Sequence, residues 1–425
     1  MLNEAFELRD TGCSTPEDCL ALPRHRWYVI KEGFSPTVFK TASDSVELSE
    51  GDAILDPFCG SGTVPLSATL DGHPAYGIEV NPFLAFVSRA KLIQCSPALI
   101  KKFLASVVDG VRCGAKSPLE SYSTFCRTEG ASKWLFNRSV LRAFEGGWNK
   151  ALQCSQPARD LLQLALLGAA MDNCNATADG KCLRYRKDWQ ETRFGKVSFI
   201  EDFEGRVDAV CSDLKISRIE TSASVIFGGD ARKIMASDGK RFKLCVTSPP
   251  YLNSFDYSDV YRPELFLGKF VSSNSELALI RKSTVRSHVQ ANWALPERSS
   301  FGSLYTKVAE EVRGRADVLW DHRIPRMIQA YFEDMERVLL RLRRLAVPGA
   351  GVWVVVATSA YAGVEVPVDF IIAEIAERSG WFLSDVGVIR HLRSSGQHLN
   401  KLGEDAPRAL HLRESVVILR TSKKK

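Results

Sequence analysis

The chain has 425 residues, of which 45% are hydrophobic, so it can bury a large core and still leave material for a second lobe. We expect one main domain that carries large insertions. The formal net charge of +6 suits a polyanionic partner, although many proteins without such a partner carry a similar charge.

The eleven cysteines are scattered, with no Cys-x-x-Cys pair and no nearby Cys/His group at metal-ligand spacing. This pattern argues against a zinc site or a regular disulfide framework, and it predicts reduced thiols, a cytoplasmic location and no bound metal. The longest apolar helix candidate, Leu161 to Met171, is too short to span a bilayer, and the N-terminus lacks a signal-peptide pattern. We therefore expect no membrane partner.

Short apolar runs and helical spacing alternate along the chain. The predicted strands lie at 53–58, 75–78, 224–227, 244–246, 351–357, 383–390 and 415–419. The predicted helices that flank them follow residue 63, cover about 328 to 342 up to Pro348-Gly349, and cover 368 to 378. This alternation predicts an α/β fold with a seven-stranded, mostly parallel sheet, which would bind ligands beyond the carboxyl ends of its strands.

Two stretches do not follow this alternation and are expected to be insertions. Residues 96–221 are expected to be largely helical, and they contain a basic and aromatic segment at 184–189. Residues 263–327 combine Trp293, Tyr305 and Trp320 with the basic residues Arg281, Lys282, Arg286, Arg298, Lys307 and Arg323. The expected divisions are thus 1–95, 96–221, 222–262, 263–327 and 328–425, with both insertions as candidate DNA-contact regions.

A glycine turn follows the first predicted strand. Gly60 and Gly62 allow the backbone to approach a ligand closely, and the amides of the following helix favour an anionic group. An ordinary tight turn is the alternative. A dinucleotide fingerprint is less well matched, because Pro65 stands in the region of the third glycine and no Gly-Lys-Ser/Thr loop follows.

The segment Asp56-Pro57-Phe58-Cys59-Gly60-Ser61-Gly62-Thr63 resembles the cofactor motif of the S-adenosylmethionine-dependent DNA amino-methyltransferases. The resemblance continues in the segment 77–82, where it implies that Glu79 accepts hydrogen bonds from both ribose hydroxyls of the cofactor. It also implies a Rossmann-like methyltransferase fold. The cofactor-binding residues that it implies in the first segment are Asp56, Pro57, Phe58, Gly60, Gly62 and Thr63.

Two weaker elements belong to the same resemblance. Asp230 matches the acid that lies near the adenine, although a strand-end aspartate that caps a helix is an alternative. Phe34 and Ser35 are similar to the segment that covers the methionine end of the cofactor, although an ordinary turn explains Ser35-Pro36 equally well.

The tetrapeptide Ser248-Pro249-Pro250-Tyr251 resembles the catalytic motif of this family. An exocyclic amine is a poor nucleophile, because its lone pair is delocalised into the base. The Ser248 oxygen and the Pro249 carbonyl can accept the two amino hydrogens, and the Tyr251 face can stack on a flipped base and stabilise developing positive charge. A proline turn after a strand is the alternative.

Serine in the first position resembles enzymes that methylate N4 of cytosine, whereas Asp or Asn is usual for N6 of adenine. The chain has no Pro-Cys dipeptide, which methylation at carbon 5 requires. The expected reaction is therefore methylation of cytosine N4, with adenine N6 as the alternative. Asp256 is a candidate to orient the base or take up the proton, and an equally good candidate helix cap.

Other classes of protein remain as alternatives. An RNA amino-methyltransferase would be expected to have Asp or Asn before Pro-Pro-Tyr and a separate RNA-binding domain. A catalytically inactive binding module would not need the intact Gly60, Gly62, Glu79 and tetrapeptide. The resemblance implies double-stranded DNA with a flipped base as partner, and it allows for a cognate restriction endonuclease in a restriction-modification system.

Overall fold

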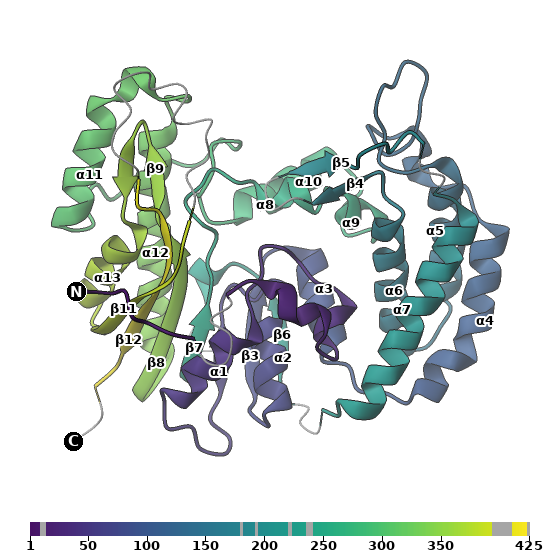
Figure 1. Cartoon of the computed structure of the whole chain (residues 1–425), viewed down its shortest axis with the longest axis horizontal. Helices are drawn as coiled ribbons and strands as arrows, with labels where there is room; N and C mark the ends of the chain where they lie inside the picture. Colours follow the sequence, from purple (N-terminus) through teal and green to yellow (C-terminus); the bar gives the residue numbers. More distant parts are fainter. Residues whose placement is uncertain are drawn as a thin grey trace.

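The central strands are built from short runs of mostly apolar, buried residues and form a sheet with helices on both faces (Figure 1). The computed structural model describes residues 1–8, 14–178, 182–191, 194–219, 223–234, 241–392 and 410–422. Within these residues, no helix is long and apolar enough to cross a membrane.

Eight strands of the described residues form one sheet, in which neighbours run parallel except where one strand pairs antiparallel on both of its sides. In spatial order they are β1 (Leu2–Asn3), β11 (Phe382–His391), β12 (Arg413–Arg420), β8 (Ala346–Ala357), β7 (Phe242–Thr247), β2 (Ile54–Asp56), β3 (Ala75–Glu79) and β6 (Val225–Gly228). The antiparallel strand is β12.

The seven predicted strands are all present, and the Rossmann-like methyltransferase fold is confirmed. If the seven predicted strands are numbered 1 to 7 in chain order, their spatial order in the sheet is 6-7-5-4-1-2-3. The last strand of the chain, β12, therefore lies between strands 5 and 6. The strand β1 adds an eighth, parallel to β11, and its two residues are too short a run to show any periodicity.

Helices cover the two faces through alternate residues of the strands. On one face, α1 (Pro36–Asp44) and α2 (Thr63–Leu70) pack on Ile54, Leu244 and Val246. On the other face, α12 (Ile324–Leu345) and α13 (Val368–Arg378) pack on the intervening residues, such as Leu55 and Cys245. Parallel pairing places the carboxyl ends of β2, β3, β6 and β7 at one edge of the sheet, and this edge lies between the two helix layers.

One predicted boundary was wrong. The helix α12 ends at Leu345, and β8 begins at once with Ala346, so Pro348 and Gly349 lie within the strand instead of between helix and strand. Pairing explains the early start, because Ala346 lies opposite Phe242 of β7 and the register shifts before the next pair. Gly349 has a φ of 72° in this irregular stretch and donates its N–H to the Ser422 carbonyl.

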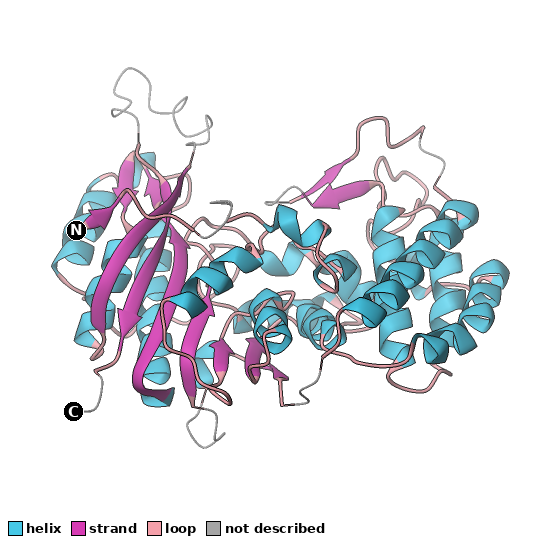
Figure 2. Ribbon diagram, turned by 60° about the horizontal axis from the view of Figure 1, so that its bottom comes forward, coloured by secondary structure: helices cyan, strands magenta, loops and turns pink. Residues whose placement is uncertain are grey.

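Residues between β3 and β6 form a helical body beside the sheet. Its helices are α3 (Pro82–Lys91), α4 (Pro97–Cys113), α5 (Arg138–Ala151), α6 (Ala158–Asp172) and α7 (Lys196–Ile216). A hairpin of β4 (Ala176–Ala178) and β5 (Leu183–Tyr185) follows α6. Figure 2 shows a group of helices at the end of the molecule opposite the two termini, and Figure 1 labels these helices α4 to α7, whereas α3 packs on β3 and β6 of the sheet. The buried Asp213 of α7 accepts hydrogen bonds from Arg24, Arg26 and Trp27, and so ties this body to the N-terminal segment.

Three short helices follow β7 and lie across the carboxyl ends of the strands in Figure 1. These roof helices are α8 (Tyr257–Val260), α9 (Arg262–Leu267) and α10 (Asn274–Ser283). Beyond them, α11 (Ser303–Gly314) packs beside a hairpin of β9 (Ser359–Tyr361) and β10 (Val364–Val366). Short 3-10 helices occur at Pro16–Leu20, His25–Trp27, Pro118–Ser121, Ala231–Lys233 and Ala316–Val318.

Candidate active site

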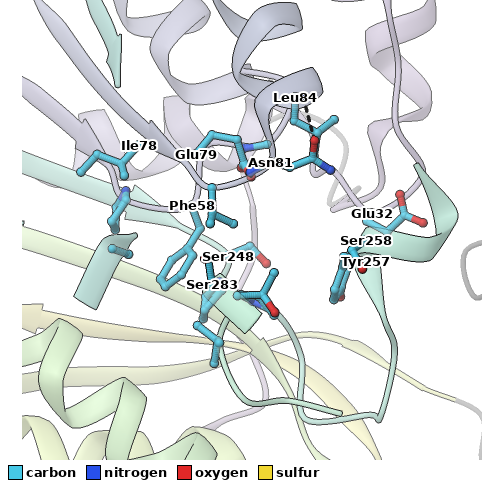
Figure 3. A pocket seen from close by; sticks show the side chains of 18 of the residues that line it. Glu32, Phe58, Ile78, Glu79, Asn81, Leu84, Ser248, Tyr257, Ser258 and Ser283 are labelled. Carbon is cyan, nitrogen blue, oxygen red and sulfur yellow. Dashed lines mark hydrogen bonds between the residues drawn. The ribbon is translucent and has the colours of Figure 1, made fainter. Parts of the chain in front are cut away.

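A cavity of about 250 Å³ lies between the carboxyl ends of the central strands and the roof helices. The strand ends line it with Pro57, Phe58, Gly60, Glu79, Asp230 and the segment 248–251. The N-terminal segment and the roof line it with residues that include Ile30, Glu32, Tyr257, Tyr261 and Thr284. Figure 3 shows Phe58, Ile78 and Glu79 on one side of Ser248, with Tyr257, Ser258 and Glu32 on the other.

The two glycines of the turn, Gly60 and Gly62, are needed for different reasons. Gly60 lines the cavity with a φ of 50°, so this part of the backbone can face a ligand. Gly62 has a φ of 84° and begins α2, but it does not line the cavity. A Cβ there would lie 2.3 Å from the Ser88 oxygen of α3, so Gly62 serves helix packing.

Asp56 joins the glycine turn to the strand that carries the tetrapeptide. Its carboxylate accepts hydrogen bonds from the Thr247 hydroxyl at 2.7 Å and from the Phe58 N–H at 3.0 Å. Burial raises the pKa of Asp56 to about 7, although both hydrogen bonds oppose the shift. Asp56 itself does not line the cavity, and neither does Thr63, which is buried in α2.

Glu79 lies at the end of β3 with both carboxylate oxygens partly engaged. Its Oε2 accepts from the Gly60 N–H at 2.9 Å, and its Oε1 accepts from the Asn81 N–H at 2.8 Å. Burial raises its pKa to about 7, against the lowering effect of these backbone donors. A carboxylate oxygen has capacity for a second donor, so Glu79 can still accept hydroxyl groups from the cavity.

Asp230 lines the cavity but also has a structural role. Its side chain accepts from the Arg232 N–H at 2.9 Å, which caps the following 3-10 turn, and it pairs with the Arg232 guanidinium at 2.8 Å. The same guanidinium lies 2.8 Å from Asp334 of α12. The capping alternative therefore holds, together with a position at the wall of the cavity.

The whole tetrapeptide lines the cavity directly after β7. Ser248 is half-buried, and its hydroxyl lies 3.5 Å from the Tyr251 hydroxyl, so its lone pairs are not consumed by a strong bond. The Tyr251 hydroxyl donates to Glu414 of β12 at 2.7 Å. Two prolines thus separate a loosely held hydroxyl from a firmly anchored ring.

Glu32 is a cavity residue that sequence reasoning missed. Its Oε2 accepts from the Tyr261 hydroxyl at 2.6 Å, whereas its buried Oε1 has no hydrogen-bond partner within the protein. An unpaired buried carboxylate oxygen favours a ligand that donates there. The only local signal was its position two residues before Phe34.

Phe34 and Ser35 themselves do not line the cavity. Phe34 packs in the core under α1, and the Ser35 hydroxyl caps α1 by accepting from the Thr37 N–H at 3.0 Å. The ordinary-turn alternative describes Ser35 and Pro36 better, and the cavity wall is formed a few residues earlier, at 30–32. The roof residues Ser283 and Thr284 also line the cavity, although residues 263–327 were expected to contact DNA.

Asp256 lies outside this cavity. Its Oδ1 accepts from the Ser258 N–H at 3.0 Å and caps α8, and its Oδ2 pairs with Arg281 at 2.5 Å. The helix-cap alternative is therefore the one that the structure shows. The Arg281 side chain consequently holds α10 to α8 rather than projecting freely.

Several other basic residues of the insertions also have internal partners. Arg286 is 5% exposed and pairs with Asp334 at 2.7 Å, and Arg186 donates to the carbonyls of Cys174 and Asp172. Arg298 pairs with Glu336 and Arg323 with Asp321. The expectation that such residues face phosphates was wrong for Arg286, because its charge is neutralised within the protein.

The chain is similar to known methyltransferases. Residues 40–118, which include the glycine turn and Glu79, match the family model described as RMKL-like, methyltransferase domain. The type II methyltransferase M.BsoBI of Geobacillus stearothermophilus is 23% identical over 93% of this chain and 85% of its own length. The type II methyltransferase M.AvaI of Nostoc sp. is 24% identical over 86% of this chain and 81% of its own.

Among solved structures, the rRNA methyltransferase aviRa of Streptomyces viridochromogenes covers 98% of this chain and 96% of its own, with 12% identity and a TM-score of 0.34. Such a score is too low to define a fold, which here rests on the strand order. The strand order, the matched methyltransferase domain and the similarity to two type II methyltransferases support an S-adenosylmethionine-dependent DNA methyltransferase family for this chain, with S-adenosylmethionine as its cofactor.

Proposed function

We propose that the chain methylates the exocyclic N4 amino group of cytosine within a specific sequence of double-stranded DNA. The observation that carries the proposal is the single cavity shared by Glu79, Asp230 and the tetrapeptide 248–251. A cofactor held by Glu79 and Asp230 would present its methyl group toward the tetrapeptide. A base that reaches this cavity must leave the duplex, so the proposal includes base flipping.

The cavity residues fit S-adenosylmethionine. Glu79 would accept from the ribose hydroxyls, and Asp230 would lie near the adenine. Glu32 offers the unpaired Oε1 to a cation, which suits the ammonium group at the methionine end. Pro57, Phe58 and Gly60 would pack against the cofactor, while Asp56, Gly62 and Thr63 would support the turn from behind.

The cofactor would supply an electrophilic methyl group on a positively charged sulfur: the C–S bond would break as the N–C bond forms, the cofactor would leave as a neutral thioether, and the surplus amino proton would pass to solvent. Ser248 would accept one amino hydrogen through its weakly engaged hydroxyl oxygen, and the Pro249 carbonyl would accept the other. Holding both hydrogens on one side directs the nitrogen lone pair toward the methyl group. The Tyr251 ring would stack on the base and stabilise the positive charge that develops on the nitrogen, while Pro250 stiffens the segment.

Serine at position 248 supports cytosine N4 over adenine N6, which remains the second candidate. An RNA substrate is less well supported, because the full-length relatives are type II methyltransferases. The same similarity supports a role in a restriction-modification system with a cognate endonuclease. Sequence reading would fall to the insertions at 96–221 and 263–327, around the catalytic parts at 1–95, 222–262 and 328–425.

The test is mass spectrometry of nucleosides from DNA incubated with the protein and S-adenosylmethionine labelled in its methyl group. Labelled N4-methylcytosine is the expected product. Labelled N6-methyladenine would retain the site but overturn the assignment of the base. Labelled 5-methylcytosine would contradict the mechanism, because the chain has no Pro-Cys nucleophile.

A further inference from the structure

Two cations lie over aromatic rings at the tip of the helical body. The Arg127 guanidinium is 5.0 Å from the Trp134 ring centroid, and the Lys133 ammonium is 5.4 Å from that of Tyr185. Trp189 joins the rings, at 4.6 Å from Trp134 and 5.1 Å from Tyr185. We call these five residues the cation–aromatic cluster.

The cluster presents charge to solvent. Arg127 and Lys133 are exposed, as is the neighbouring Lys187, whereas the three rings are half-buried. The segments 127–138 and 182–191 contain six Lys and Arg residues against three Asp and Glu residues. The rings hold the stems of the cations in place, so less freedom is lost when these groups bind an anion.

Backbone contacts fix the cluster on the protein. Asn175 donates its backbone N–H to the Leu135 carbonyl at 2.7 Å and its side-chain amide to the Trp134 carbonyl at 3.1 Å. Arg186 donates to the Cys174 carbonyl at 2.8 Å, which holds the β5 strand against the end of α6. These bonds make the two segments one rigid unit.

The preceding segment 122–124 joins this unit to the roof of the cavity, since the Thr124 carbonyl accepts from the Leu135 N–H at 2.9 Å. Arg262 of α9 donates to the Thr124 hydroxyl at 3.0 Å, and Tyr122 packs on Phe266 of α9 with ring centroids 4.9 Å apart. Figure 1 shows β4 and β5 beside the roof helices α9 and α10. A duplex whose flipped base enters the cavity would therefore have this unit next to its backbone.

We propose that the cation–aromatic cluster, with Lys187, binds phosphates of the DNA duplex that flank the target base. This inference rests on the proposed function, since it takes DNA as the substrate. It selects this surface because Arg186, Arg281 and Arg286 are engaged within the protein, whereas Lys133 and Lys187 present ammonium groups to solvent. Each phosphate contact would release counterions and make binding depend on salt.

The test compares Lys133→Glu/Lys187→Glu with the control Lys102→Glu. Lys102 is also exposed and lies 5.5 Å from a ring, that of Phe103, but it belongs to α4, which lies on the side of the helical body remote from the roof helices in Figure 1. DNA affinity is measured by fluorescence anisotropy of a labelled duplex at several KCl concentrations. Cofactor affinity, measured by calorimetry, reports whether each variant is folded.

The double variant should bind the duplex about tenfold more weakly or worse, and the slope of log K against log salt should fall by about one for each lost contact. The control should bind like the parent, and all three proteins should bind the cofactor equally. Parental affinity and slope in the double variant would overturn the inference while methylation by the parent protein upholds the proposed function. A parent that neither binds nor methylates DNA would overturn both.

Discussion

The Tyr251 hydroxyl donates a 2.7 Å hydrogen bond to Glu414 Oε1, which ties the tetrapeptide to strand β12. Glu414 is 4% exposed and also accepts from the Ser14 hydroxyl at 2.6 Å and from Arg390 at 2.8 Å. Burial and the nearby carboxylate hold the pKa of Tyr251 well above its usual value. The hydroxyl therefore remains a donor at neutral pH, and the ring is held at the wall of the cavity.

Substitution of Tyr251 should separate stacking from anchoring. Tyr251→Ala removes the ring, and the loss of base stacking, about 1–3 kcal/mol, should lower single-turnover methylation by roughly tenfold to a hundredfold. Tyr251→Phe keeps the ring and loses only the hydrogen bond, so its rate should lie between that of Ala and the parent. Cofactor affinity should not change in either variant. A parental rate in Tyr251→Ala would remove the ring from the reaction.

Glu414 should act as a positioning residue through Tyr251. Glu414→Ala leaves the Tyr251 hydroxyl without its acceptor, at a cost of about 1–3 kcal/mol in unfolding free energy. It should reduce the methylation rate about as much as Tyr251→Phe, whereas Glu414→Gln keeps an amide oxygen as acceptor and should recover part of it. The double variant with Tyr251→Phe tests the link. If the two effects on rate simply multiply, Glu414 does not act through the tyrosine.

The weak engagement of Ser248 predicts a different pattern. Ser248→Ala removes an acceptor for one amino hydrogen and breaks only a 3.5 Å contact with Tyr251. We therefore expect a lower rate of methyl transfer at saturating DNA and cofactor, with little change in thermal stability. Rapid-quench kinetics measure the first and calorimetric melting the second. A large loss of stability without a loss of rate would assign Ser248 to folding.

Local patterns in the sequence were sufficient to predict the strands and the acids at their ends. Short apolar runs and the glycine turn depend on neighbours in the chain, and they located Glu79, Asp230 and the tetrapeptide at one edge of the sheet. Glu32 and Thr284 reach the same cavity only through the packing of the roof. Their short segments carry no periodicity that would reveal this position.

Charge alone was a poor guide to which basic residues are free to bind a phosphate, because their partners lie far away in the chain. In the sequence, Arg286 seemed available to bind a phosphate. Its partners Glu333 and Asp334 lie 47 and 48 residues later, on α12, and become its neighbours only after folding. Ser35 similarly has a capping role that depends on where α1 begins. Pairing between segments distant in the chain therefore decides whether a charged side chain is free to bind a ligand or is part of a buried ion pair.

The hydrogen bond between Asp56 and Thr247 should stabilise the connection between the glycine turn and the tetrapeptide. Thr247→Val removes the donor that lowers the pKa of Asp56, so that pKa should rise further. The loss of one of the two hydrogen bonds to this buried carboxylate oxygen should cost about 1–3 kcal/mol of unfolding free energy at pH 8, measured by urea denaturation. The loss should be smaller at pH 5, where Asp56 is protonated in the folded protein. Equal losses at both pH values would show that ionisation of Asp56 is not involved.

Glu79 should make cofactor binding depend on pH. Burial raises its pKa to about 7 in the free protein, and the ribose hydroxyls would donate to its ionised form. Affinity should therefore be constant above pH 7 and fall as the pH decreases below it, approaching about tenfold for each pH unit. For the free protein, the raised pKa favours the folded state most at acidic pH, and this contribution is lost as the pH rises to about 7.

The matched control is Glu79→Gln, which keeps an acceptor oxygen but cannot ionise. It should bind S-adenosylmethionine more weakly than the parent above pH 7, and the difference between the two proteins should narrow as the pH falls to 6. The pKa of Asp56 is also raised to about 7, and α-amino groups such as that of the cofactor have a pKa of about 7.7–8.0 in model compounds. Both groups are present with either protein, and the charge of Glu79 is the smallest of the causes that shift the pKa of Asp56, so the difference in calorimetric affinity reports mainly on Glu79. A difference in affinity that stays constant between pH 6 and pH 8 would show that cofactor binding does not depend on the charge of this carboxylate.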